Sequence, residues 1–184
     1  MELLLAARVV LQTQPQVAFL VCGVTRDPAY NDSLRRKAAE LGIADKVVIT
    51  SYIGDIADVW KVADINVHAS LMDSSPISIH ESMALGLPGV FTDTGGVPDL
   101  VEPGETALLV PVGDVQALAH GIETLLTDRA LAERLGRGAR RRYETYHRPE
   151  IMATAITDLF EEVAAAHQVE GYRRRESPQI AGDA

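Results

Sequence analysis

Short, continuous apolar runs alternate with longer amphipathic stretches along most of this sequence. Five such runs read as strands: VAFLVCG (17–23), KVVIT (46–50), DINVHAS (64–70), LPGVFTD (87–93) and ALLVP (107–111). Most of them lack the apolar–polar alternation of a half-exposed strand, which is typical of strands covered on both faces of a parallel sheet. We therefore predict a doubly wound, Rossmann-like α/β fold, in which helices cover both faces of a parallel sheet of about five strands in three layers.

The stretches between the runs carry helix signals. The stretch 28–42, for example, begins with a proline and ends at a glycine, as helices commonly do. On this basis helices are predicted over 2–12, 28–42, 56–63, 75–86, 114–128, 129–146 and 149–168. We expect one folded domain over 1–168 and a disordered polar tail over 169–184.

The first predicted element is a helix rather than a strand. Doubly wound folds normally begin with a central strand, whose turn into the following helix binds the ligand. We therefore expect the first strand of the sheet to be missing from this chain. An open sheet edge is predicted where that strand would pair.

Charge and composition exclude several classes of protein. The 26 acidic and 17 basic side chains give a formal net charge of −9, which disfavours nucleic acid as a partner. A single cysteine, Cys22, allows no disulfide framework and indicates a reducing compartment. No apolar run approaches the ~20 residues of a transmembrane helix. The five histidines show no metal-binding spacing, so no metal site is predicted.

The clearest site signals lie in residues 73–88, where Asp73 is followed by SSPISIHESMALGLP. Ser75 is predicted to cap a helix in which Pro76 takes the first position. The N-terminus of such a helix presents oriented N–H donors and a partial positive charge. This part of the chain is therefore a candidate anion site, suited to phosphate.

Glu81 falls between Ile77 and Leu85 on a helical wheel, whereas Ser78 and Ser82 fall on the polar side. The wheel therefore predicts a carboxylate within a core-facing apolar stripe, where it would be costly unless a partner satisfied it. The alternative is a Glu at the edge of the stripe that extends to water or pairs with an arginine.

Asp73 precedes the same helix. From the ~1.5 Å rise per residue, its carboxylate should stand about 10 Å from that of Glu81. This spacing suits a long ligand with hydroxyl groups at both ends and an anion in the middle, such as a nucleotide sugar. The alternative is an ordinary acidic residue that favours the helix dipole.

The segment from Asp73 to about 126 resembles the C-terminal, donor-binding domain of the group 1 glycosyltransferases (glycosyltransferase family 4), which are retaining enzymes of GT-B architecture. The resemblance rests on a Glu-x7-Glu-like spacing, a Gly-x-Pro strand, a Gly-Gly-x-Pro turn and the LLVPVGD segment, and it extends over about residues 1–165. Three positions depart from the family pattern. Asp73 stands where most members have Glu, Gly89 replaces a strand Val, and Asp99 replaces the Glu of the glycine turn.

The resemblance implies a substrate and roles for particular residues. It implies a nucleotide-sugar donor, most commonly UDP- or GDP-linked, and no cofactor. Asp73 would hold the sugar hydroxyls and Glu81 the ribose, as the catalytic pair. Further donor-binding positions that it implies are Gly23, Gly54, Asp55, Ile56, Ser75, Pro76, Ile77, Ser78, Gly95 and Gly96. For Gly23 a plain turn glycine, and for Gly54 to Ile56 a solvent loop that caps the next helix, remain open alternatives.

The resemblance also implies parts that this sequence does not contain. In the family, an Arg and a Lys that neutralise the diphosphate lie upstream, as does the N-terminal acceptor-binding domain. We therefore expect half of a two-domain cytoplasmic glycosyltransferase, peripheral to the membrane in the full enzyme, and no sugar transfer by this half alone. The alternative is a non-catalytic or degenerate nucleotide-binding or interaction module on the same fold.

Overall fold

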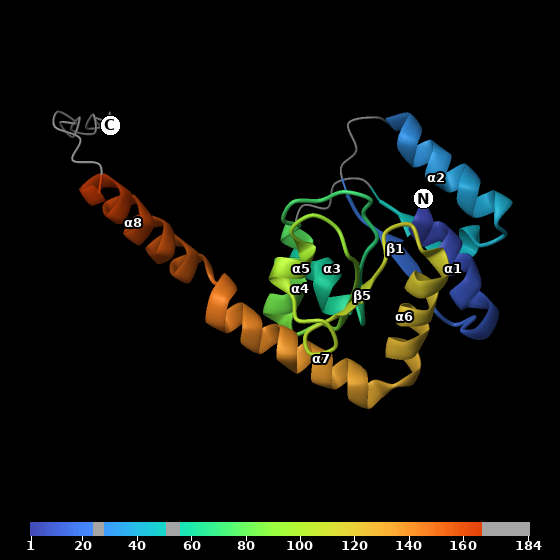
Figure 1. Cartoon of the computed structure of the whole chain (residues 1–184). Coiled ribbons are helices and arrows are strands. Elements are labelled where there is room, and N and C mark those ends of the chain that lie inside the picture. The colour runs from blue at the N-terminus through green and yellow to red at the C-terminus, as the bar shows by residue number, and fades with distance from the viewer. Residues whose placement is uncertain (24–27, 51–55, 167–184) are drawn as a thin grey trace, which may run out of the picture. The chain divides into compact units, whose positions relative to one another are not determined.

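The computed structural model describes residues 1–23, 28–50 and 56–166 (Figure 1). Residues 1–147 form one compact unit, and the helix α8 (Pro149–Ala166) belongs to a second unit. The predicted tail over 169–184 and the predicted site residues Gly54 and Asp55 lie outside the described residues. Within the described part of the chain, no helix is both long enough and apolar enough to cross a membrane.

All five predicted strands are confirmed, each somewhat shorter than its apolar run. They are β1 (Phe19–Val21), β2 (Val47–Ile49), β3 (Asn66–His68), β4 (Gly89–Thr92) and β5 (Leu108–Val110). Every pair that these strands form is parallel. The doubly wound α/β class is therefore confirmed.

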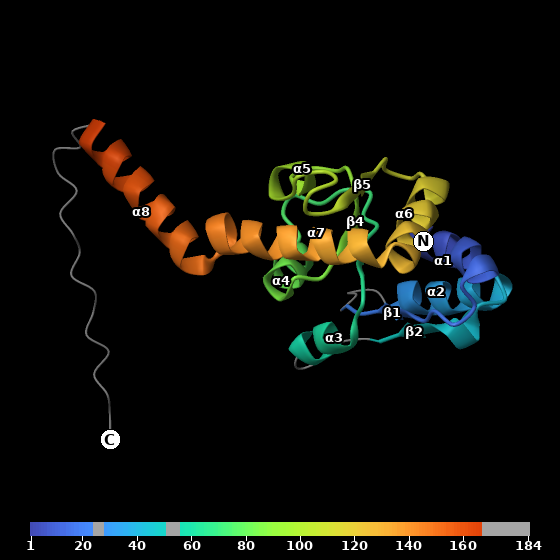
Figure 2. The same ribbon diagram turned by 90° about the horizontal axis from the view of Figure 1, so that it is seen from below.

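The strands form two sheets rather than the one continuous sheet that was predicted. Within the described residues, β1 pairs only with β2, whereas β3, β4 and β5 form a trio with β4 in the middle; Figure 2 shows the two sheets apart. A doubly wound sheet has the order 3-2-1-4-5-6, in which the first strand is central. If β1 to β5 are numbered as the second to sixth strands of that order, β1 and β2 fall on one side of the first strand and β3, β4 and β5 fall on the other side. The open edge that was predicted where the first strand would pair therefore separates the strand pair from the trio.

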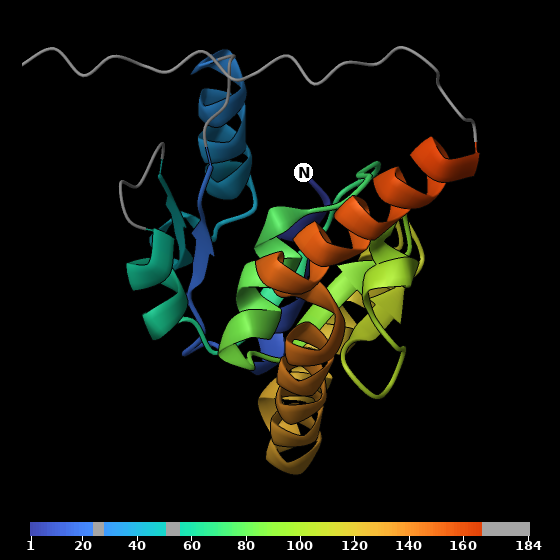
Figure 3. The ribbon, with the colours of Figure 1, turned by 90° about the vertical axis from the view of Figure 1, so that its left-hand side faces the viewer.

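The predicted helices are also confirmed, with small shifts of their ends. They are α1 (Glu2–Thr13), α2 (Pro28–Glu40), α3 (Ile56–Val62), α4 (Ile77–Leu85), α6 (Val115–Thr127), α7 (Arg129–Arg142) and α8. Two further turns had not been predicted, a short 3-10 helix at Ala44–Lys46 and the four-residue helix α5 (Val97–Leu100). The last predicted turns of the 129–146 helix form a π-helical segment, Tyr143–His147. Figure 3 shows α2 beside the β1–β2 pair, against which it packs.

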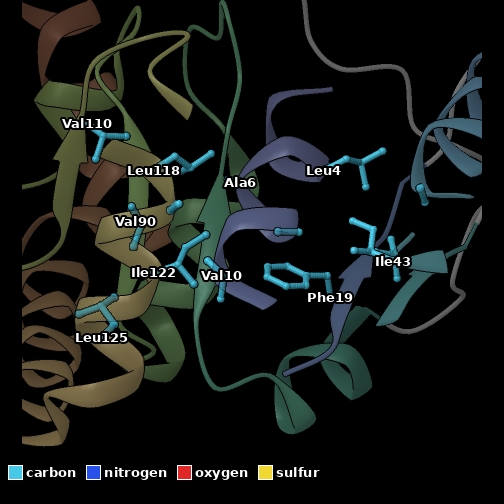
Figure 4. Close-up of a cluster of buried hydrophobic side chains, with 14 of the residues drawn as sticks. Leu4, Ala6, Val10, Phe19, Ile43, Val90, Val110, Leu118, Ile122 and Leu125 are labelled. Carbon is cyan, nitrogen blue, oxygen red and sulfur yellow. The ribbon is translucent and has the colours of Figure 1, made fainter. Parts of the chain in front are cut away.

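Helix α1 lies at the centre of the main hydrophobic core. Its buried face consists of Leu4, Ala6, Ala7 and Val10, the last three with no exposed surface. Figure 4 shows Ala6 and Val10 between two groups of side chains, with Val90 and Ile122 on one side and Phe19 on the other. Because Phe19 belongs to the strand pair and Val90 to the trio, α1 joins the two sheets through a shared core.

Helix α6 packs against β4 and β5 of the trio, α7 packs against α6, and both helices begin with matched caps. Asp114 accepts a hydrogen bond from the Ala117 N–H, and Asp128 accepts one from the Leu131 N–H, each at 2.9 Å. Such caps satisfy N–H groups that the helix cannot pair internally. They fix where both helices begin, and α7 then runs alongside α4, the helix of the candidate site.

Candidate functional site

Helix α4 begins one residue later than predicted, and Ser75 does not cap it. Pro76 is the N-cap residue, Ile77 is the first helical residue, and no side chain caps the helix among the described residues. Ser75 lies outside the helix, where its own N–H donates to Asp73 Oδ1 at 3.2 Å. This local turn uses Asp73 to shape the backbone, so the predicted capping role of Ser75 is wrong.

The uncapped start of α4 keeps the properties that an anion requires. The first N–H groups of a helix have no partner within the helix, and here proline supplies none at the N-cap position. Ile77 and Ser78 carry the first N–H groups of the helix, and Pro76 before them is buried. The partial positive charge of the helix N-terminus therefore faces out beside Asp73.

The helical wheel predicted the wrong buried face for α4. The buried face consists of Ile79 and Met83 together with Ser82, which has no exposed surface. Ile77 and Leu85, which were expected to face the core, are 72% and 54% exposed. Glu81 therefore lies on the outward side of the helix, half-buried, and not in a core-facing stripe.

Two hydrogen bonds explain why the Ser82 hydroxyl can be buried. Its hydroxyl accepts a hydrogen bond from Asn66 Nδ2 at 2.8 Å and donates one to the Ile79 carbonyl at 2.9 Å. Asn66 itself is buried at the start of β3 and also donates to the Ser78 carbonyl at 3.2 Å. A satisfied polar pair of this kind can be buried at little cost, and it fixes how α4 is turned on β3.

The partner of Glu81 is a tryptophan. The indole Nε1–H of Trp60 in α3 donates to Glu81 Oε2 at 2.9 Å, and this contact is partly buried. The alternative of an arginine partner finds no support among the described residues. Trp60 had not been singled out from the sequence. The one available signal was that it is the only tryptophan in a chain with few aromatic residues.

Asp73 lies beside a histidine at the end of β3. His68 Nε2 is 3.4 Å from Asp73 Oδ2 but lacks the alignment of a hydrogen bond, and this nitrogen has no other partner among the described residues. Burial lowers the pKa of the His68 imidazole, and the Asp73 carboxylate opposes this shift only in part. A neutral His68 with one unpaired ring nitrogen therefore adjoins the carboxylate.

The segment 70–74, which carries Asp73, is held by the last residue of β4 and by residues that follow it. The hydroxyls of Thr92 and Thr94 donate to the carbonyls of Ser70 and Leu71 at 2.7 and 3.2 Å. Gly96 N–H donates to the Asp73 carbonyl at 3.3 Å. These bonds fix the backbone on which the Asp73 side chain is mounted.

The Gly95–Gly96 pair packs directly against that segment. A Cβ atom at Gly95 would lie 1.8 Å from the Asp73 carbonyl oxygen, and one at Gly96 would lie 2.0 Å from that of Ser74. The close contact between these two backbone segments is thus sufficient to explain why both positions are occupied by glycine. The expected approach of a ligand to this pair stays a prediction.

The other predicted positions are spread over neighbouring elements. Gly23 is exposed just beyond the C-terminal end of β1, and Ile56 is the first residue of α3, the helix that carries Trp60. Among the described residues, no group of histidine, cysteine, aspartate or glutamate side chains could hold a metal ion. The site therefore brings together Asp73, Glu81 and the start of α4.

Comparisons with known proteins identify the family of this chain. The family described as glycosyl transferases group 1 matches residues 1–142. D-inositol 3-phosphate glycosyltransferase from Streptomyces avermitilis is 32% identical over 174 residues, which is 90% of this chain and 37% of that protein. The chain thus spans less than half the length of this relative.

Solved structures show the same fold. Sucrose-phosphate synthase from Thermosynechococcus elongatus is similar with a TM-score of 0.78 and 29% identity, over 89% of this chain and 42% of that one. Alr3699/HepE of Anabaena, solved in complex with UDP, is similar with a TM-score of 0.79 and 23% identity, over 86% of this chain and 44% of that one. The parallel α/β fold is that of GT-B glycosyltransferases, and the chain belongs to the group 1 glycosyl transferases.

Proposed function

We propose that this chain is the donor-binding half of a retaining glycosyltransferase, which binds a nucleoside-diphosphate sugar for transfer of the sugar to an acceptor hydroxyl. One observation carries the proposal. Two carboxylates, Asp73 and Glu81, flank the uncapped N-terminal turn of α4 in a chain of the group 1 family. This arrangement pairs hydroxyl-binding groups with an anion-binding group between them.

Each part of the proposed site has a role that its chemistry supports. Asp73 accepts hydrogen bonds from hydroxyls of the donor sugar, and Glu81 accepts them from the ribose. The N–H groups of Ile77 and Ser78 face the diphosphate. When the bond between the sugar and the diphosphate breaks, negative charge grows on the leaving group, and the helix N-terminus stabilises that charge.

The proposed donor is UDP- or GDP-linked. The complex of Anabaena Alr3699/HepE with UDP supports a uridine nucleotide as the first candidate, because the two chains share a fold. The proposed partner is an acceptor-binding domain, since the similar proteins are more than twice as long as the part that this chain matches. Transfer is then a property of the two domains together.

The proposal is tested by replacing Glu81 with Gln, which keeps the shape of the side chain and removes its charge. Charge-assisted hydrogen bonds contribute roughly 1.5–3 kcal/mol each, so loss of one should weaken UDP or GDP binding by about tenfold or more. Glu40→Gln, at an exposed position of α2, is the matched control and should bind as the parent does.

Isothermal titration calorimetry gives the affinities, and thermal melts give the stability of each variant. If the parent chain binds neither nucleotide at millimolar concentrations, the proposed function is wrong. The ribose role of Glu81 is also wrong if Glu81→Gln binds both nucleotides as tightly as the parent while melting several degrees lower.

A further inference from the structure

We propose that Trp60 is a positioning residue, which holds the Glu81 carboxylate in the orientation that binds the ribose of the donor. This inference rests on the proposed function. It starts from the hydrogen bond between the indole Nε1–H and Glu81 Oε2 at 2.9 Å. Trp60 belongs to α3 and Glu81 to α4, so two separate elements converge on one carboxylate.

The chemistry of the indole group favours a positioning role over charge neutralisation. An arginine in this place would bring a positive charge and a fork of N–H groups that engages both carboxylate oxygens. The indole brings one N–H and no charge. No cationic side chain therefore pairs with Glu81 among the described residues, and Oε1 has no protein donor among them. That oxygen and the remaining lone pair of Oε2 are available to two neighbouring hydroxyls.

Burial explains why the orientation is fixed before a ligand arrives. Both side chains are half-buried, and a flexible glutamate would otherwise sample several rotamers on the outward face of α4. A tryptophan has only two side-chain torsions, so its N–H group samples few orientations. The bond to Trp60 thus removes rotational freedom from Glu81 in the empty site, which favours binding through preorganisation.

Trp60→Phe separates positioning from packing, because it removes the N–H group and keeps an aromatic ring. The probes are UDP and 2′,3′-dideoxyuridine 5′-diphosphate, which lacks both ribose hydroxyls. Trp60→Phe should weaken UDP binding roughly three- to tenfold. It should leave the affinity for the dideoxy nucleotide unchanged. In a Glu81→Gln background it should cause no further loss of UDP affinity, since the two residues act through one contact.

Tryptophan fluorescence adds a direct readout, since Trp60 is the only tryptophan of the chain. Glu81→Gln should alter the emission of Trp60 in the absence of ligand. Addition of UDP to the parent chain should alter it as well. A Trp60 that serves packing alone predicts no response of the emission to UDP.

The outcomes distinguish this inference from the proposed function. Equal affinity of the parent for UDP and its dideoxy analogue would overturn the ribose role of Glu81, and the inference with it. If Glu81→Gln weakens UDP binding and Trp60→Phe does not, only the inference is overturned. If Trp60→Phe lowers the affinity for both nucleotides equally, or lowers only the melting temperature, Trp60 serves packing and the inference is overturned.

Discussion

Replacement of Gly136 by Ala tests how closely α7 packs against the end of α4. A Cβ atom at Gly136 would lie 2.2 Å from the carbonyl oxygen of Gly86 and 3.2 Å from its carbon. Gly86 ends α4 in the left-handed conformation, with a φ of 71°, and its N–H bonds back to the last turn of the helix. The peptide that carries the Gly86 carbonyl is itself held, because its N–H, that of Leu87, donates to the Ser82 carbonyl at 3.0 Å, so the oxygen cannot easily turn aside.

Two opposing effects decide the sign of the change. Alanine is better than glycine inside a helix by about 1 kcal/mol. Against this, ordinary contact of a Cβ begins near 3.4 Å, so the added methyl group is more than an ångström too close. Overpacking against backbone that cannot relax costs about 3 kcal/mol. The net loss should be about 2 kcal/mol, or roughly 4–8 °C in Tm for a chain of this size.

Urea and thermal unfolding of the parent and of Gly136→Ala measure this loss. Gly23→Ala is the control, because none of the described residues lies within 4 Å of the Cβ that it would add. It should change stability by less than ~0.5 kcal/mol. An unchanged or raised stability of Gly136→Ala would refute the reasoning, since helix propensity would then outweigh the close contact.

Three further predictions concern the site and its surroundings. Ser82→Ala should lower the free energy of unfolding by about 1–3 kcal/mol in urea titrations, because Asn66 Nδ2 then keeps only the Ser78 carbonyl; an unchanged midpoint would contradict the buried pair. Burial lowers the pKa values of His68 and His147 from 6.5, so the unfolded chain binds more protons below pH 6.5. Stability should therefore be constant above that pH and fall as the pH is lowered toward 5, and melts that improve in acid would show the sign to be wrong. Gly95→Ala, at a φ of +52° and 1.8 Å from the Asp73 carbonyl, should shift the amide NMR signals of residues 73–75 and lower Tm, and unaltered signals would argue against the contact.

The elements of the fold could be predicted because their signals are local. Each strand coincides with a continuous apolar run, and most helices are bounded by a proline, an aspartate or a glycine. Helix α5 was missed because its four residues are too few for any periodicity to show. The division of the sheet was missed because it depends on strand order, which adjacent residues do not encode.

The geometry of the site was less accessible from the sequence. Helix α4 carries apolar residues on both sides, Ile77 and Leu85 on one and Ile79 and Met83 on the other, so hydrophobicity alone could not choose its buried face. Asn66, which is distant in sequence, decides the matter by pairing with Ser82. The partner of Glu81 is likewise non-local, because Trp60 reaches it from another helix.

The place of α1 between the two sheets has a consequence for synthesis on the ribosome. Helix α1 ends at Thr13, whereas α6, which packs against it, begins only at Val115. At about 5–20 residues per second, roughly 5–20 s separate the emergence of the two helices. During that interval the apolar face of α1 has no α6 to cover it. The nascent chain is then most dependent on chaperones and most exposed to proteases, and completion of α6 ends this period by allowing the core to close.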